Sequence, residues 1–186
     1  MAARLTLRRP AAATAMALAM ALLGGTVLAA CAAPRRGPTY PPADATPAAA
    51  GSQTDAARAL VVGALTSAGR AAGDPGQPYR TAEGAWFAAA PRTVVQVTVP
   101  TESSPRFIVL YAFASAADAA TAASDQATYV SRGPGKVYFP LDTRFTIRLV
   151  GSVALFFAWS PANADPRAMD VETALDTVGT AVAIPT

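Results

Sequence analysis

The sequence predicts an α+β domain, in which an antiparallel sheet of four or five strands carries about three helices on one face. Four segments rich in β-branched and aromatic residues form two pairs, each joined by a short turn-forming sequence. An Ala-rich helical segment separates the two pairs, and helical patterns also precede the first pair and follow the second. The predicted order is therefore α-(β)-ββα-ββα, where the bracketed strand is short.

Periodic apolar residues, high Ala content and end signals predict helices over residues 54–69, 115–130 and 166–179. The second has the clearest beginning, because Ser115 is followed three residues later by Asp118, the spacing of a capping box. The third follows an Asp-Pro pair and ends at a glycine, an arrangement typical of helix termini. These three segments account for the helices of the expected fold.

The first pair of strands is expected at "TVVQVTVP" (93–100) and "RFIVLYAF" (106–113), joined as an antiparallel hairpin. The second of these strands is apolar on both faces, which indicates a central place in the sheet. The segment "GAWFAA" (84–89) is interpreted as the short additional strand.

The second pair of strands, 143–150 and 153–160, flanks the sequence Gly-Ser at 151–152. A two-residue loop with Gly first is typical of a type II′ hairpin turn. Such a turn fixes the register, so that Arg144 is expected opposite Trp159. One face of this hairpin is purely apolar and is expected in the core.

The other face of the same hairpin combines arginines with large apolar side chains, and two interpretations stay open. The first interpretation is a binding surface, since apolar patches rimmed by charge often bind partners. Alternatively, Arg144 stacks on Trp159 and the loop of residues 73–87 covers the rest. The candidate binding residues are Arg144, Arg148, Leu155, Phe157 and Trp159.

The residue types give little sign of catalysis. The chain has no His, and its one Cys lies near the N-terminus, so no metal site, cofactor or catalytic residue is predicted. Glu83, Glu102 and Asp142 are scattered along the sequence. If two such carboxylates met in a cleft, they could hydrolyse an envelope polymer, and this is the alternative to a non-catalytic binding or accessory module.

The N-terminus has the pattern of an export signal: a basic start with no acid, then about twenty uncharged, mostly small or apolar residues. The sequence Leu28-Ala29-Ala30-Cys31 resembles the bacterial lipobox. That resemblance implies cleavage between Ala30 and Cys31 and a diacylglyceryl group on the Cys31 sulfur. Two acyl chains anchor a protein stably in a membrane.

Three regions follow from this assignment: a signal peptide at 1–30, a lipidated Cys with a Pro/Ala-rich disordered tether at 31–52, and one globular domain at 53–186. The expected location is the extracytoplasmic side of the cell envelope, held by the lipid; the alternative, with cleavage elsewhere, is a secreted protein. Without the signal peptide, basic and acidic side chains are equal in number, so no nucleic-acid partner is predicted.

The segments "VVQVTVP", "FIVLYAFASAADAA" and "RLVGSVALFFAWS", followed by a short C-terminal helix, resemble a group of small secreted bacterial lipoproteins of uncharacterised function. The resemblance covers about residues 58–182. It supports the α+β fold and implies no catalytic residue. Besides the membrane, the expected partner is an envelope protein or a small ligand. The sequence predicts no oligomeric state.

Overall fold

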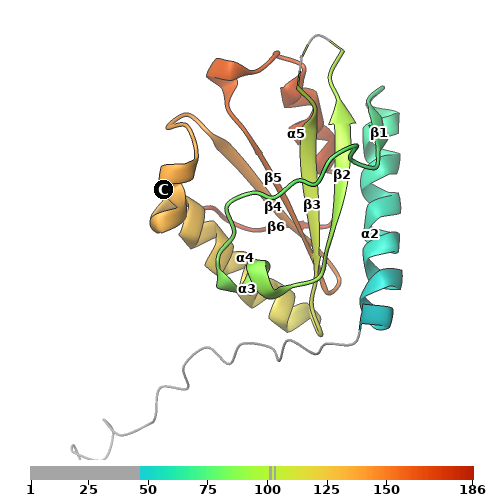
Figure 1. Cartoon of the computed structure of the whole chain (residues 1–186), viewed down its shortest axis with the longest axis vertical. Helices are drawn as coiled ribbons and strands as arrows, with labels where there is room; N and C mark the ends of the chain where they lie inside the picture. Colours follow the sequence, from blue (N-terminus) through green and yellow to red (C-terminus); the bar gives the residue numbers. More distant parts are fainter. Residues whose placement is uncertain (1–46, 101, 103) are drawn as a thin grey trace, which may run out of the picture. The chain divides into compact units, whose positions relative to one another are not determined.

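The computed structural model describes residues 47–100, 102 and 104–186, and these form an α+β domain with one antiparallel sheet of six strands (Figure 1). The expected fold class is confirmed, with more strands than the four or five expected. The helices are α2 (Pro47–Ser67), α3 (Ala85–Ala89), α4 (Ala116–Ser131) and α5 (Ala168–Leu175), with short 3₁₀ helices η1 (Pro134–Tyr138) and η2 (Pro161–Asn163). The strands are β1 (Ala71–Gly73), β2 (Arg92–Thr98), β3 (Arg106–Ala112), β4 (Arg144–Val150), β5 (Val153–Trp159) and β6 (Thr180–Ala181).

The sheet has the strand order β1-β2-β3-β5-β4-β6, so the two predicted hairpins meet at its centre. The predicted central strand, β3, lies between β2 and β5, which explains why both of its faces are apolar. The register of the β4–β5 hairpin is also confirmed, with Arg144 opposite Trp159. Gly151 has φ +58, the left-handed backbone that the first position of a type II′ turn requires.

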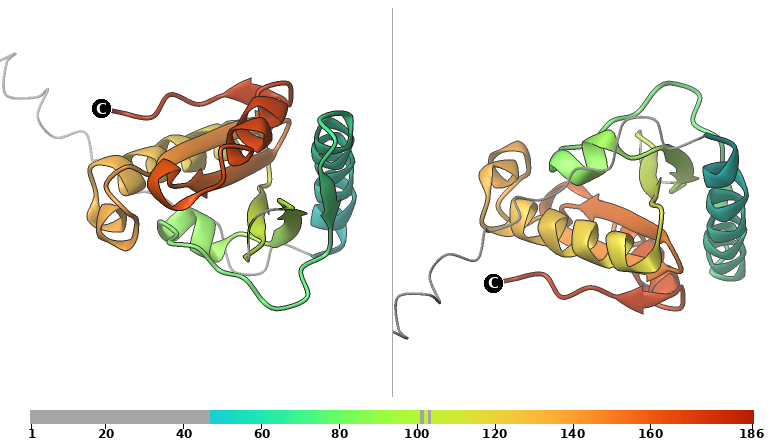
Figure 2. Two further views of the ribbon diagram at one scale, coloured as in Figure 1. Left: turned by 90° about the horizontal axis from the view of Figure 1, so that it is seen from above. Right: turned by 90° about the horizontal axis from the view of Figure 1, so that it is seen from below.

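Helices cover both faces of the sheet, whereas the sequence places them on one. On one face, α2 contributes Ala57, Val61 and Leu65 to a core cluster that also includes α5. On the opposite face, α4 and α3 pack over the other side of β3 and β5. Figure 2 (right) shows α4 lying across the strands of the second hairpin. Both faces of β5 carry apolar side chains, so helices are needed on both faces of the sheet. With them in place, every residue of β5 except Ala158 is buried.

Three short elements differ from the sequence analysis. The segment "GAWFAA" forms α3 rather than a strand, because its alanines favour a helix and it buries only Phe87. The strands β1 and β6 were not expected from the sequence. Each is three residues or fewer and pairs along an outer strand of the sheet, β1 with β2 and β6 with β4.

The helix ends follow the sequence signals at α4 but not at α2 or α5. Helix α5 covers Ala168–Leu175 with Arg167 at its N-cap, shorter than the expected 166–179, because the chain forms turns at 166–167 and 176–177. Ser115 caps α4, since its hydroxyl accepts a hydrogen bond from the Asp118 N–H at 3.1 Å and donates to the Asp118 carboxylate at 2.7 Å. Helix α2, however, begins at Pro47, within the expected 31–52 tether, because Pro is favoured in a first helical turn and alanines follow it. The signal peptide, Cys31 and the rest of the tether lie outside the described residues.

Within the described part of the chain, no helix combines the length and the hydropathy that crossing a membrane requires.

Candidate functional site

The hairpin face proposed as a binding surface lies inside the domain. Leu155 and Phe157 have no exposed surface, Trp159 is 4% exposed, and all three belong to the core cluster under α2 and α5. The guanidinium of Arg144 stands 5.5 Å from the centre of the Trp159 ring, as the alternative interpretation expected. The covering elements are helices and not the loop 73–87, whose Phe87 packs on the opposite face. Four of the five candidate residues are therefore buried, and Arg144 is the one that stays exposed.

Arg148, the other arginine of that face, holds the segment between α5 and β6. Its Nε donates to the carbonyl of Val178 at 2.5 Å, and Nη2 donates to the carbonyls of Asp176 (2.8 Å) and Gly179 (3.1 Å). Nη1 also donates to the Asp176 carboxylate at 2.9 Å. The guanidinium therefore pairs carbonyls of the segment between α5 and β6, which is a structural task.

A hydrolytic pair was considered among Glu83, Glu102 and Asp142. Each of these acids has its own hydrogen-bond partners. Glu83 accepts hydrogen bonds from arginine side chains and a tyrosine, Glu102 from Arg106, and Asp142 from the Ser160 hydroxyl at 2.7 Å. The Ser160 hydroxyl and the Ala162 N–H lower the pKa of Asp142. Burial alone would raise the pKa of Glu102, but hydrogen bonds from Arg106 and the Asp165 N–H outweigh it and lower that pKa.

A general acid of a glycosidase needs a raised pKa, so the lowered pKa values of Glu102 and Asp142 do not favour that role. No group of three or more His, Cys, Asp or Glu side chains that could hold a metal ion occurs in the described part of the chain.

A groove of about 520 Å³ lies where the loop before α3 meets the end of α4 and η1, and it has the composition of a binding site. Four of its seven lining residues are aromatic and one is an arginine. The lining residues are Tyr79, Arg80, Thr81, Ala82, Tyr129, Tyr138 and Phe139.

The loop that forms one wall of this groove is held by two buried polar side chains. Gln126 of α4, which has no exposed surface, accepts from the Gly84 N–H at 2.7 Å and donates to the Ala82 carbonyl at 2.9 Å. The Glu83 side chain is 3% exposed and accepts from the Tyr111 hydroxyl at 2.8 Å. These contacts fix the loop against both the helix and the sheet, so the wall is formed before any ligand arrives.

Glu83 also orients the arginine of the groove. It accepts from Arg80 Nε at 2.8 Å and from Arg92 Nη1 at 3.1 Å. The Arg80 side chain is 57% exposed, and only its Nε is bonded within the described chain. Its terminal nitrogens are therefore available to an anion. Burial, together with the hydrogen bond to Glu83, raises the pKa of Tyr111, so this tyrosine remains a hydrogen-bond donor to the carboxylate.

The opposite wall is fixed by close packing of aromatic rings. A Cβ on Gly135 would lie 2.3 Å from the Tyr129 ring, so η1 rests directly on this ring only because residue 135 is glycine. Phe139 packs edge-on against Phe145 at 4.9 Å between ring centres. On the loop wall, Tyr79 stacks on Phe107 at 4.1 Å between ring centres, and burial raises the pKa of its hydroxyl. Tyr138 is 70% exposed at the rim.

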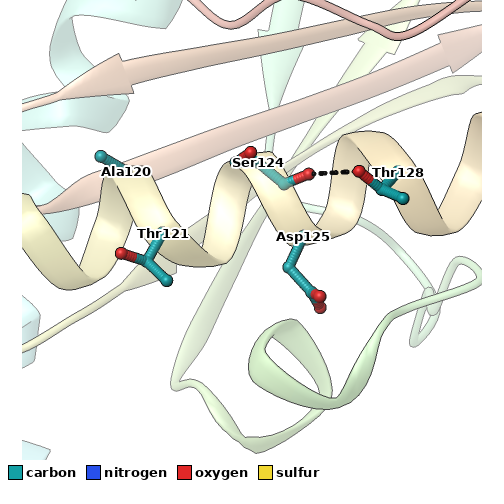
Figure 3. A pocket seen from close by; sticks show the side chains of 5 residues that line it. All are labelled: Ala120, Thr121, Ser124, Asp125 and Thr128. Carbon is teal, nitrogen blue, oxygen red and sulfur yellow. Dashed lines mark hydrogen bonds between the residues drawn. The ribbon is translucent and has the colours of Figure 1, made fainter. Parts of the chain in front are cut away.

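A second hollow, on the outer side of α4, lacks these features (Figure 3). It is shallow, and its lining side chains are small: Ala120, Thr121, Ser124, Asp125 and Thr128. The hydroxyls of Thr121 and Thr128 donate to carbonyls of their own helix. This surface presents a single charged group and no aromatic ring.

The aromatic groove was not expected from the sequence, because the loop before α3 is far in sequence from the end of α4 and η1, which form the rest of its lining. A usable signal was the spacing of Tyr129, Tyr138 and Phe139 around the Gly/Pro-rich segment that follows α4. Cys31 and Ala30 lie outside the described residues, so the structure does not bear on their predicted roles. Comparison with protein-family models, curated protein sequences and solved structures finds no significant match for this chain.

Proposed function

We propose that this chain is a lipid-anchored protein of the extracytoplasmic side of the bacterial envelope, whose domain is a non-catalytic module that binds a small amphipathic anion. The anchor is supported by the lipobox pattern at residues 28–31. The binding role is supported above all by one observation, the preformed groove with aromatic walls and a half-exposed Arg80.

The lining of the groove argues for the class of ligand. Aromatic side chains offer large apolar contact areas with little loss of conformational freedom. A guanidinium recognises carboxylate, sulfonate or phosphate groups through parallel N–H donors. A ligand with an apolar body and one acidic group therefore satisfies both walls at once. It would place its acid on Arg80 and its body against Tyr129, Tyr138 and Phe139.

The anchor is tested by labelling cells that express the full chain with radioactive palmitate. We expect the wild-type chain to carry the label and Cys31→Ser to carry none, because the thiol is the acylated group. As a control, Ser52→Cys in the Cys31→Ser chain moves the thiol outside the lipobox pattern and should stay unlabelled. An unlabelled wild-type chain, or a labelled Cys31→Ser chain, would contradict the anchor.

The groove is tested with 8-anilinonaphthalene-1-sulfonate, an amphipathic anion whose fluorescence rises in apolar surroundings. We expect Arg80→Gln to weaken its binding about tenfold, through loss of a charge-assisted hydrogen bond. Tyr138→Ala, which removes an aromatic side chain of the rim, should act in the same direction.

Arg92→Gln is the matched control, since Arg92 also binds Glu83 but does not line the groove. It should leave the dissociation constant within about twofold of the wild type. If Arg92→Gln weakened binding as much as Arg80→Gln, or if neither rim variant did so, the assignment of the groove would fail.

A further inference from the structure

The connection from η1 to β4 exposes an unusual amount of apolar surface. Among the described residues, the three most exposed large hydrophobic side chains all lie within five positions of one another. They are Val137 (81% exposed), Tyr138 (70%) and Leu141 (98%). We call residues 134–141 the apolar tip. Exposed hydrophobic side chains that cluster in this way commonly mark a surface that contacts a partner or a membrane.

The apolar tip is held in place by its other side chains. Phe139 points inward and packs against Phe145 and Phe156, with ring centres 4.9 and 6.4 Å apart. Gly135 is buried against the Tyr129 ring. Prolines at 134 and 140 further restrict the backbone of the segment. The exposed side chains are thus presented outward from a fixed base, although burying them would be favourable.

The stretch of chain that ends with the apolar tip carries only basic side chains, of which Arg132 donates to the carbonyl of Thr186. No acidic residue occurs from residue 126 to residue 141, and this stretch contains Arg132 and Lys136, the latter being the one lysine of the chain. Asp142 follows directly, but its carboxylate accepts hydrogen bonds from the Ser160 hydroxyl and the Ala162 N–H, both at 2.7 Å. A surface of apolar side chains with neighbouring cations fits an anionic bilayer surface.

The length of chain before the domain keeps it near such a surface. Cys31 precedes the start of α2 at Pro47 by sixteen positions, which span at most about 55 Å when fully extended. The tip of a lipid-anchored domain can therefore return to the membrane that holds the anchor. Tyrosine is also a residue favoured at the level of lipid headgroups.

We propose that the apolar tip binds the surface of an anionic lipid bilayer, with Val137 and Leu141 entering the interface and Lys136 facing the headgroups. The proposal rests on the proposed lipid anchor for its setting, and it does not depend on the ligand of the groove. Membrane contact would make the tip a second attachment point, which fixes the orientation of the domain on the lipid surface.

The test uses residues 32–186, which contain all of the described residues and lack the apolar signal sequence. We measure the fraction of this protein that sediments with lipid vesicles. One kind of vesicle contains equal amounts of phosphatidylglycerol and phosphatidylcholine, and the other contains phosphatidylcholine alone. We expect wild-type binding to the mixed vesicles. Val137→Ser with Leu141→Ser should reduce this binding at least about tenfold, because apolar burial drives interfacial attachment. Lys136→Gln should reduce binding to the mixed vesicles about fivefold and should not change binding to the phosphatidylcholine vesicles.

Leu60→Ser and Met169→Ser are matched controls, because they replace exposed hydrophobic side chains elsewhere on the domain. They should bind the mixed vesicles as the wild type does. The proposal is overturned if the wild type stays in solution, or if the control variants lose as much binding as the tip variants. Failure of the lipid anchor would instead appear as absence of palmitate on the full chain, so the two proposals fail separately.

Discussion

At the scale of single residues, Arg148 shows how one buried side chain can hold the segment that follows a helix. It is 8% exposed on β4 and binds three carbonyls between residues 176 and 179. We predict that Arg148→Lys lowers the free energy of unfolding by about 2 kcal/mol, because an ammonium group cannot reach all of these acceptors at once. Urea unfolding monitored by circular dichroism measures the change.

Arg144 provides the control on the same strand and the same face. Its side chain is 54% exposed, lies over the Trp159 ring and stands 3.8 Å from the Glu172 carboxylate. Because Lys keeps the charge at this exposed site, Arg144→Lys should change stability by less than about 1 kcal/mol. Equal losses in the two variants would mean that the hydrogen bonds of Arg148 contribute no more than an exposed cation does.

At the scale of elements, the sequence predicts best where a local signal determines the structure. The β4–β5 hairpin was predicted to the residue, because a two-residue Gly-Ser turn fixes both the register and the faces. The capped helix α4 was predicted for the same reason. The strands β1 and β6 could not be predicted, since each pairs with a strand distant in sequence and has few residues to carry a pattern.

The candidate site, in contrast, could not be predicted from the sequence. Its walls come from the loop before α3, the end of α4 and η1, and nothing local in the sequence brings these three together. The hairpin face that the sequence predicts to bind a partner is mostly buried, for a related reason. Arg148 and Trp159 look like surface residues on a strand, but α2 and α5 cover them, and their polar atoms find partners on α5 and the chain that follows it.

At the scale of the whole molecule, one carboxylate joins segments that lie far apart in the chain. Glu102, in the β2–β3 turn, accepts two hydrogen bonds from Arg106, at 2.6 and 2.7 Å, and one from the Asp165 N–H, at 2.8 Å, just before α5. These bonds favour the ionised form and lower the pKa of Glu102 below its ordinary value of 4.5, although burial opposes the shift. The folded state therefore prefers the carboxylate more strongly than the unfolded chain does.

This difference predicts the acid sensitivity of the domain. The stability contributed by Glu102 is complete above the unfolded pKa, near 4.5, and is lost as the pH falls through the lower folded pKa. Glu102→Gln should therefore be less stable than the wild type at neutral pH, and the two should converge in acid. Urea unfolding between neutral pH and about pH 3 measures the convergence.

Arg106→Gln tests the same linkage from the other side, because it leaves Glu102 partly buried without its cation. Burial then dominates and raises the pKa of Glu102, so protonation should favour the folded state. We expect the stability that Arg106→Gln loses, relative to the wild type, to be largest at neutral pH and to be recovered as the solution is acidified. If the stability difference between each variant and the wild type stayed constant with pH, Glu102 would act through packing alone, and the ion pair would not couple the turn to α5.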